Sequence, residues 1–81
     1  MSTVTVQLFA SYAESFGGPT LDVLLKSGST VGDLLDSLRL LPGASILPDS
    51  ARVAVNRKFA THDQLVNARD EIALIPPVAG G

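Results

Sequence analysis

The chain has 81 residues, of which 46% are hydrophobic, and a net charge of −2. This length fits one domain, and its core must come from aliphatic packing because the chain has no cysteine for disulfides or thiolate metal sites. The six basic residues are dispersed, which gives nucleic-acid binding no electrostatic support, and the one histidine, His62, has no metal-ligand spacing around it.

No stretch approaches the ~18 consecutive apolar residues of a membrane span. The N-terminal Met1-Ser2-Thr3 lacks the positive charge of a signal peptide. We therefore expect a cytoplasmic protein that binds neither nucleic acid nor membranes.

The first strand is predicted over residues 4–10, where apolar and other side chains alternate with the period of two typical of a half-buried strand. The same alternation puts Phe9 on the outer face, among polar residues. The residues expected to face the core are Val4, Val6, Leu8 and Ala10.

Residues 11–19 are predicted to be a connection, because they end in Gly17-Gly18-Pro19, a strong turn signal. A second strand follows over residues 21–26, where Leu21, Val23 and Leu25 alternate again. We expect these two strands to pair antiparallel.

A helix of about eleven residues is predicted after Thr30. Thr30 and Asp33 have the spacing of a capping box, in which the Thr30 hydroxyl accepts the backbone N–H of residue 33. Pro42-Gly43 stops the helix. The residues at helical spacing that predict its core face are Val31, Leu34, Leu35, Leu38 and Leu41.

Three further strands are predicted in the second half of the chain. Residues 53–55 and 58–60 read as two short strands around Asn56, a residue suited to a turn with positive φ. Residues 42–50 read as a loop, and residues 61–69 are ambiguous, with one helical turn as an option. The last strand covers residues 72–75.

This order of elements predicts an α+β fold, the β-grasp architecture of ubiquitin, with a mixed four- to five-stranded sheet and one main helix on one face. The domain is expected to span residues 1–75. Phe9 and Ile75 should both point outward on the uncovered sheet face. They are either the start of a partner surface or isolated apolar surface residues.

A projecting, flexible tail is predicted over residues 76–81. Pro76 and Pro77 fix φ, end the strand and hold the following residues extended. Gly80 and Gly81 have no Cβ, so the backbone there fits a narrow slot. An enzyme could activate the terminal carboxylate of such an arm, and the alternative is a frayed end.

Three other features allow a functional interpretation beside a structural one. His62 next to Asp63 is either an acid–base pair or, as we favour, a surface pair. Tyr12 is expected to pack at the edge of the core. A cationic group either attracts an acidic partner or forms a solvated hairpin surface; it consists of Arg52, Arg57 and Lys58.

Three segments together resemble the MoaD/ThiS family of sulfur-carrier proteins. They are V-T-V-Q-L-F-A (4–10), T-V-G-D-L-L-D-S-L (30–38), and V-A-V-N-R-K-F-A through D-E-I-A-L-I-P-P-V-A-G-G (53–81). The Pro-Pro-Val before the last residues favours the molybdopterin branch of this family over the thiazole branch.

The resemblance implies that an ATP-dependent adenylyltransferase, similar to ubiquitin-activating enzymes, adenylates the Gly81 carboxylate. Sulfur from a donor protein then replaces the AMP and leaves a thiocarboxylate. In the large subunit of molybdopterin synthase, two successive sulfur transfers to a pterin precursor build the dithiolene of molybdopterin. The chain itself would bind no cofactor and would be the non-catalytic sulfur donor of a complex of two small and two large subunits.

The resemblance also assigns roles to single residues. Gly81 would carry the sulfur, and Gly80 would allow a slim approach to the partner's active site. Arg69 stands in a turn that often contains Asp-Gly in the family, and since Arg resists positive φ, we expect that turn to differ in shape. The partner-binding residues would be Phe9, Ile75, Pro76, Pro77, Val78 and Ala79.

Three alternative functions remain open at this point. The chain could carry sulfur to another acceptor, in thiazole, cysteine or tRNA thiolation. It could be a ubiquitin-like modifier that is joined to lysines through Gly81. It could also be a binding module with an inert tail.

Overall fold

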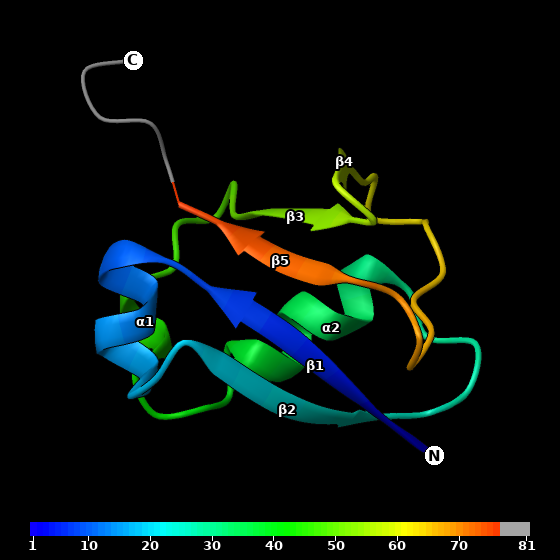
Figure 1. Cartoon of the computed structure of the whole chain (residues 1–81), viewed down its shortest axis with the longest axis horizontal. Helices are drawn as coiled ribbons and strands as arrows, with labels where there is room; N and C mark the ends of the chain where they lie inside the picture. Colours follow the sequence, from blue (N-terminus) through cyan, green and yellow to red (C-terminus); the bar gives the residue numbers. More distant parts are fainter. Residues whose placement is uncertain (77–81) are drawn as a thin grey trace.

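Five strands form one mixed sheet in the computed structural model, which describes residues 1–76 (Figure 1). The strands β1 and β5 run parallel at its centre, and the other neighbours pair antiparallel. This arrangement confirms the predicted β-grasp class and the predicted pairing of the first two strands. In spatial order the strands are β2 (Thr20–Leu25), β1 (Ser2–Leu8), β5 (Ile72–Ile75), β3 (Arg52–Val55) and β4 (Lys58–Phe59).

The alternation in β1 is confirmed as far as Leu8, and Val4, Val6 and Leu8 are buried. The prediction that Ala10 faces the core is wrong, because Ala10 is exposed. Its backbone adopts a φ of 49°, in the left-handed region, and this ends the extended conformation on which the alternation depends.

The predicted connection over residues 11–19 is also wrong, since most of it is a short helix, α1 (Ala10–Phe16). The Phe9 carbonyl accepts the backbone N–H of Ala13 at the start of this helix. Gly17 ends the helix with a φ of 90°, and the N–H groups of Gly17 and Gly18 both donate to the Ala13 carbonyl. The glycine pair is therefore a helix C-cap.

The main helix, α2 (Val31–Leu38), begins with the predicted capping box. The Asp33 N–H donates to the Thr30 hydroxyl at 3.2 Å, and the Thr30 N–H donates to the Asp33 carboxylate at 2.9 Å. The helix ends earlier than predicted, because the Leu41 N–H bonds to the Leu38 carbonyl three residues back. Leu41 still packs against the core from this turn.

The core lies between the sheet and α2, which covers one sheet face (Figure 1). Ile72 and Leu74 of β5 are both 0% exposed, as are Leu34 and Leu38 of α2. Tyr12, expected at the edge of the core, is instead 1% exposed, because α1 turns its ring inward. The leucine stripe of α2 is thus a core face, as predicted.

The hairpin of β3 and β4 turns at Asn56 and Arg57, whose φ values are 53° and 70°. The positive φ predicted for Asn56 is confirmed. A short 3₁₀-helix, η1 (Ala44–Ile46), lies in the preceding loop. Residues 61–69 form no helical turn in the structure, and Leu65 instead bridges to Thr30.

The turn before β5 closes without a left-handed residue at Arg69, as expected. The Asp70 N–H donates to the Asn67 carbonyl at 3.0 Å, and the Asp70 carboxylate accepts the Asn67 N–H at 2.9 Å. Among residues 1–76, no helix is long and apolar enough to cross a membrane. The predicted tail lies outside the described residues except for Pro76.

Candidate partner-binding site

The sheet face opposite α2 carries a row of side chains across four strands. Gln7 pairs with Ala73, Ala73 with Ala54, and Ala54 with Phe59, so all four side chains lie on the same outer face. The two alanines at the centre are small. The middle of this row is therefore lower than its surroundings.

A hollow of about 320 Å³ lies over these alanines, and we call it the outer groove. Its two aromatic residues, Phe9 and Phe59, are 46% and 61% exposed. Single exposed apolar residues are common on protein surfaces, but gathered ones mark interaction sites. The groove is lined by Gln7, Phe9, Ala54, Arg57, Phe59, Glu71, Ala73 and Ile75.

The structure brings together Phe9 and Ile75, the two described strand-end residues predicted to bind a partner. Because β1 and β5 are parallel and Leu8 pairs with Leu74, the next residue of each strand reaches the same end of the sheet (Figure 1). Both line the outer groove. Pro76 follows Ile75 and lines a neighbouring hollow of about 160 Å³. Binding by these residues stays a prediction.

Phe59 was missed as a member of this surface by sequence reasoning. The residue was assigned to a strand, but its face depends on the register of a two-residue turn. A turn at Asn56 and Arg57 pairs Ala54 with Phe59 and thereby puts Phe59 beside Ala73 on the outer face. The sequence feature that could have placed Phe59 on this face is the two-residue length of the turn between the two short strands.

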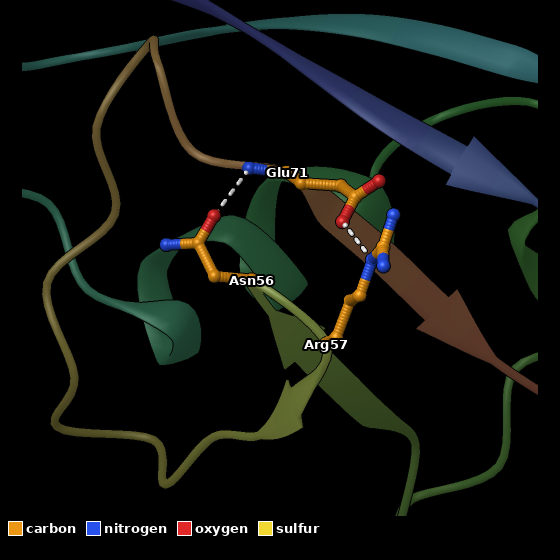
Figure 2. A network of polar contacts seen from close by, with 3 residues as sticks. All are labelled: Asn56, Arg57 and Glu71. Atoms are coloured by element: carbon orange, nitrogen blue, oxygen red, sulfur yellow. Dashed lines mark hydrogen bonds and ion pairs between the residues drawn. The ribbon is translucent and has the colours of Figure 1, made fainter.

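A network of polar contacts links the β3–β4 turn to the start of β5, and two of its residues, Arg57 and Glu71, line the outer groove. The Asn56 N–H donates to the Glu71 carbonyl at 2.7 Å, and the Glu71 N–H donates to the Asn56 side-chain oxygen at 3.0 Å. Arg57 Nε donates to the Glu71 carboxylate at 3.1 Å, and Figure 2 shows these two side chains turned toward each other. The Asn56 amide also donates to Asp70 at 3.2 Å.

A second arginine lies beside the groove on the same face. Arg52 pairs with Ile75 across β3 and β5, and its guanidinium carbon lies 4.2 Å from the centre of the Phe59 ring. This is the geometry of a cation–π interaction. The wall formed by Phe59 thus has one arginine stacked on it and another, Arg57, in the groove lining beside it.

The other side of the outer face is polar. The Thr5 hydroxyl donates to the Asp22 carboxylate at 2.7 Å between β1 and β2. Leu24 is 59% exposed and adjoins no residue of the groove lining in the sheet register, because its partner in β1 is Thr3. The apolar area is therefore concentrated over β5, β3 and β4, together with Phe9.

The described residues offer little acid–base chemistry. His62 and Asp63 are both exposed and share no hydrogen bond within residues 1–76, which favours the surface interpretation. Burial raises the pKa of the Tyr12 hydroxyl, and the Arg39 charge partly opposes this shift. No group of three His, Asp or Glu side chains in the described part of the chain is placed to hold a metal ion.

Five of the predicted site residues lie outside the described residues. They include both residues to which the chemistry was assigned, Gly80 and Gly81, and the partner-binding residues Pro77, Val78 and Ala79. Their predicted roles rest on the sequence.

Comparison with known proteins gives a family and a set of relatives. A family model described as the ThiS family matches residues 6–81. The molybdopterin synthase sulfur carrier subunit of Arabidopsis thaliana is 38% identical over 79 residues, which cover 96% of this chain and 82% of the relative. Small archaeal modifier protein 1 of Haloferax volcanii is 37% identical over 84 residues, which cover 93% of this chain and 97% of the relative.

Solved structures agree with the fold. A crystal structure of the H. volcanii modifier protein matches with a TM-score of 0.83 and 33% identity, over 96% of this chain and 100% of that one. A complex of subunits 1 and 2 of the molybdopterin-converting factor from Helicobacter pylori contains a chain that matches with a TM-score of 0.68. At 20% identity, over 98% of this chain and 99% of that one, the match concerns the fold alone.

Proposed function

The chain belongs to the ThiS family, and we propose that it is the sulfur-carrier small subunit of a molybdopterin synthase. One observation carries this proposal. The 38% identity with the Arabidopsis sulfur carrier subunit extends over 96% of the chain. The match to the family model also runs through Gly81, the residue that would carry the sulfur.

The chemistry needs only the terminal carboxylate from this chain. In the proposed sequence, the Gly81 carboxylate attacks the α-phosphorus of ATP in an activating enzyme, and pyrophosphate leaves. Hydrosulfide from the sulfur donor then attacks the acyl carbon, AMP leaves, and loss of the S–H proton gives a thiocarboxylate. This group is a competent nucleophile once a partner holds it beside the pterin precursor. All acid–base groups would come from the partner enzymes.

The outer groove would bind these partners, the large subunit and the activating enzyme. It presents Phe9, Phe59 and Ile75 as apolar contacts. The six residues from Pro76 to Gly81 span at most about 20 Å, at ~3.5 Å per residue. Gly81 can therefore reach an acceptor site on a docked partner only if that site lies within this distance of the groove. A heterotetramer of two small and two large subunits is the proposed assembly.

Intact-protein mass spectrometry tests the proposal on untagged chain isolated from cells that make the cofactor. The expected result is a fraction with one oxygen exchanged for sulfur, localised to Gly81. Deleting Gly81 should remove this fraction and all synthase activity while the unfolding transition stays unchanged. A deletion that unfolds the domain, or an unmodified Gly81 in active cells, would contradict the proposal.

The match to the H. volcanii modifier protein favours a second candidate function, a ubiquitin-like modifier joined to lysines through Gly81. A ladder of conjugates that persists on denaturing gels and depends on Gly81 would support it. Sulfur on Gly81 together with binding to a different acceptor enzyme, in thiazole, cysteine or tRNA thiolation, would instead keep the carrier function and change the pathway.

A further inference from the structure

Arg57 occupies a turn position at which glycine is the usual residue. The two-residue turn between β3 and β4 has positive φ at both positions, as in the type I′ hairpins that favour Asn-Gly. A non-glycine residue in this region carries a steric cost because its Cβ approaches the following carbonyl oxygen. The ion pair of Arg57 with Glu71 is solvent-exposed, with the Arg57 side chain 86% exposed, and such pairs contribute little to folding stability. Folding stability alone therefore gives little reason for arginine at this position.

The Arg57 guanidinium bonds to Glu71 through one nitrogen and still has donors to offer. Its Nε is bonded to the Glu71 carboxylate, which in turn belongs to the network around Asn56 (Figure 2). Within residues 1–76, no hydrogen bond uses the two terminal nitrogens of this side chain. Those nitrogens form the edge with which arginine binds a carboxylate in a bidentate manner.

Arg52 supplies a second guanidinium on the same face. Its position over the Phe59 ring holds it next to the apolar wall of the outer groove. It also lines the neighbouring hollow together with Ile75 and Pro76. Along this wall two arginines, Arg52 and Arg57, lie against one carboxylate, that of Glu71, while the Asp70 carboxylate lies in the adjoining turn, bonded to Asn56. The wall itself therefore carries an excess of positive charge on a chain whose net charge is −2.

Lys58 shows by contrast that this placement is specific. It belongs to the same hairpin and is also exposed, but it pairs with buried Val55. Because side chains alternate along a strand, Lys58 leaves the sheet on the face opposite to Phe59. Lys58 therefore provides a matched control for the two arginines.

We propose that the outer groove recognises a partner-protein surface that presents an apolar side chain next to carboxylates. The apolar side chain lies over Ala54 and Ala73, between Phe9 and Phe59. The carboxylates bind the guanidinium groups of Arg57 and Arg52. This inference refines the docking role in the proposed function by naming the chemistry of the partner surface.

Two short peptides with the same apolar centre test this recognition. We would titrate acetyl-DLFD-amide and acetyl-KLFK-amide into the isotope-labelled full chain and follow backbone amide and arginine Nε signals by NMR. The acidic peptide should shift the signals of Ala54, Ala73, Arg52 and Arg57. It should bind roughly fivefold more tightly than the basic peptide, the ratio expected for about 1 kcal/mol from exposed charge pairs. About 1 M salt should remove the difference.

Three arginine variants and one lysine control then assign the preference to the arginines. Arg57→Gln and Arg52→Gln should each reduce the preference for the acidic peptide, and the double variant should abolish it. Lys58→Gln should leave it unchanged. Equal binding of the two peptides, no binding of either, shifts on another face, or an equal loss in Lys58→Gln would overturn the proposal.

The test does not depend on Gly81, so it is separate from the proposed function. An unmodified Gly81 would refute the sulfur-carrier function and leave the peptide result standing. With the synthase large subunit as the probe, affinity should fall as salt rises, and the fall should be smaller for the double arginine variant. Binding of the wild-type chain that is insensitive to salt would contradict the charge contacts.

Discussion

Gly43→Ala should be among the most destabilising single-methyl changes in this domain. Gly43 lies between α2 and η1 and has a φ of 93°, in the left-handed region. A Cβ added to it would overlap the backbone carbonyl oxygen of Ser15, in α1. The loop after α2 therefore touches α1 backbone to backbone, and the absence of a side chain permits that contact.

The magnitude follows from two terms. Placing alanine in the left-handed region costs about 1 kcal/mol. Relieving the overlap requires α1 or the loop to move, because a backbone carbonyl cannot rotate away as a side chain can, and such overpacking costs about 2 kcal/mol. The sum of about 3 kcal/mol is a large part of the roughly 4–12 kcal/mol expected for a chain of this length.

Gly28→Ala provides the control. Gly28 also has a left-handed backbone, with a φ of 83°, but a Cβ there would meet no atom within 4 Å. It should lose only about 1 kcal/mol. Urea unfolding of both variants, followed by circular dichroism, measures the difference directly if the slopes agree. Equal losses in the two variants would refute the tight contact between Gly43 and α1.

Three further predictions concern a hydroxyl, a turn and a cap. Tyr12→Phe should leave stability unchanged or raised at neutral pH, because the buried hydroxyl has no hydrogen-bond partner within residues 1–76. Since the pKa of Tyr12 is raised from 10.0, the unfolded chain ionises first, so stability should fall more steeply in the wild type than in this variant as pH rises above about 10, as measured by urea unfolding. Arg57→Gly should leave the free energy of unfolding unchanged or slightly higher, since glycine suits the turn, while the preference for the acidic peptide is reduced. Thr30→Ala should lower the free energy of unfolding by about 1 kcal/mol in the same assay, because it removes the cap of α2. Thr30→Ser keeps the capping hydroxyl and should therefore keep most of the wild-type stability.

The parts of the fold that sequence predicted correctly depend on neighbours in the chain. The alternation of Val4, Val6 and Leu8 and the capping box at Thr30 are local patterns, and the structure contains both. The stripe on α2 is likewise set by helical spacing. In each case the residue types and their separation are enough to determine the face or the boundary.

The helix α1 escaped prediction because its stability is tertiary. It has seven residues, no side-chain cap at Phe9, and a first residue, Ala10, with a left-handed backbone. A helix this short is not stable by propensity alone. The helix depends on the burial of Tyr12 in the core and on the contact of Ser15 with Gly43. Both contacts involve residues that lie far from α1 in the sequence.

Only part of the candidate site could be predicted from the sequence, because the other part depends on contacts between distant segments. Phe9 directly follows β1 and Ile75 is the last residue of β5, so their outward direction could be predicted from the alternation of each strand alone. The position of Phe59 depends on the pairing of β3 with β4 and of β3 with β5, and the two arginines depend on the same register. The sequence grouped Arg52, Arg57 and Lys58 on one hairpin, and only the register places the two arginines on the outer face and Lys58 on the other.

The position of β5 gives the proposed function a mechanical basis. This strand is hydrogen-bonded to β1 on one side and to β3 on the other, and its inward residues Ile72 and Leu74 are fully buried. Its outward residues Ala73 and Ile75 line the outer groove. A partner that binds the groove therefore contacts β5, the strand that directly precedes residues 76–81. Docking would fix the starting point of that segment without any rearrangement of the domain, so binding free energy would serve to place Gly81 near its acceptor. A carrier built in this way has no need for catalytic side chains of its own.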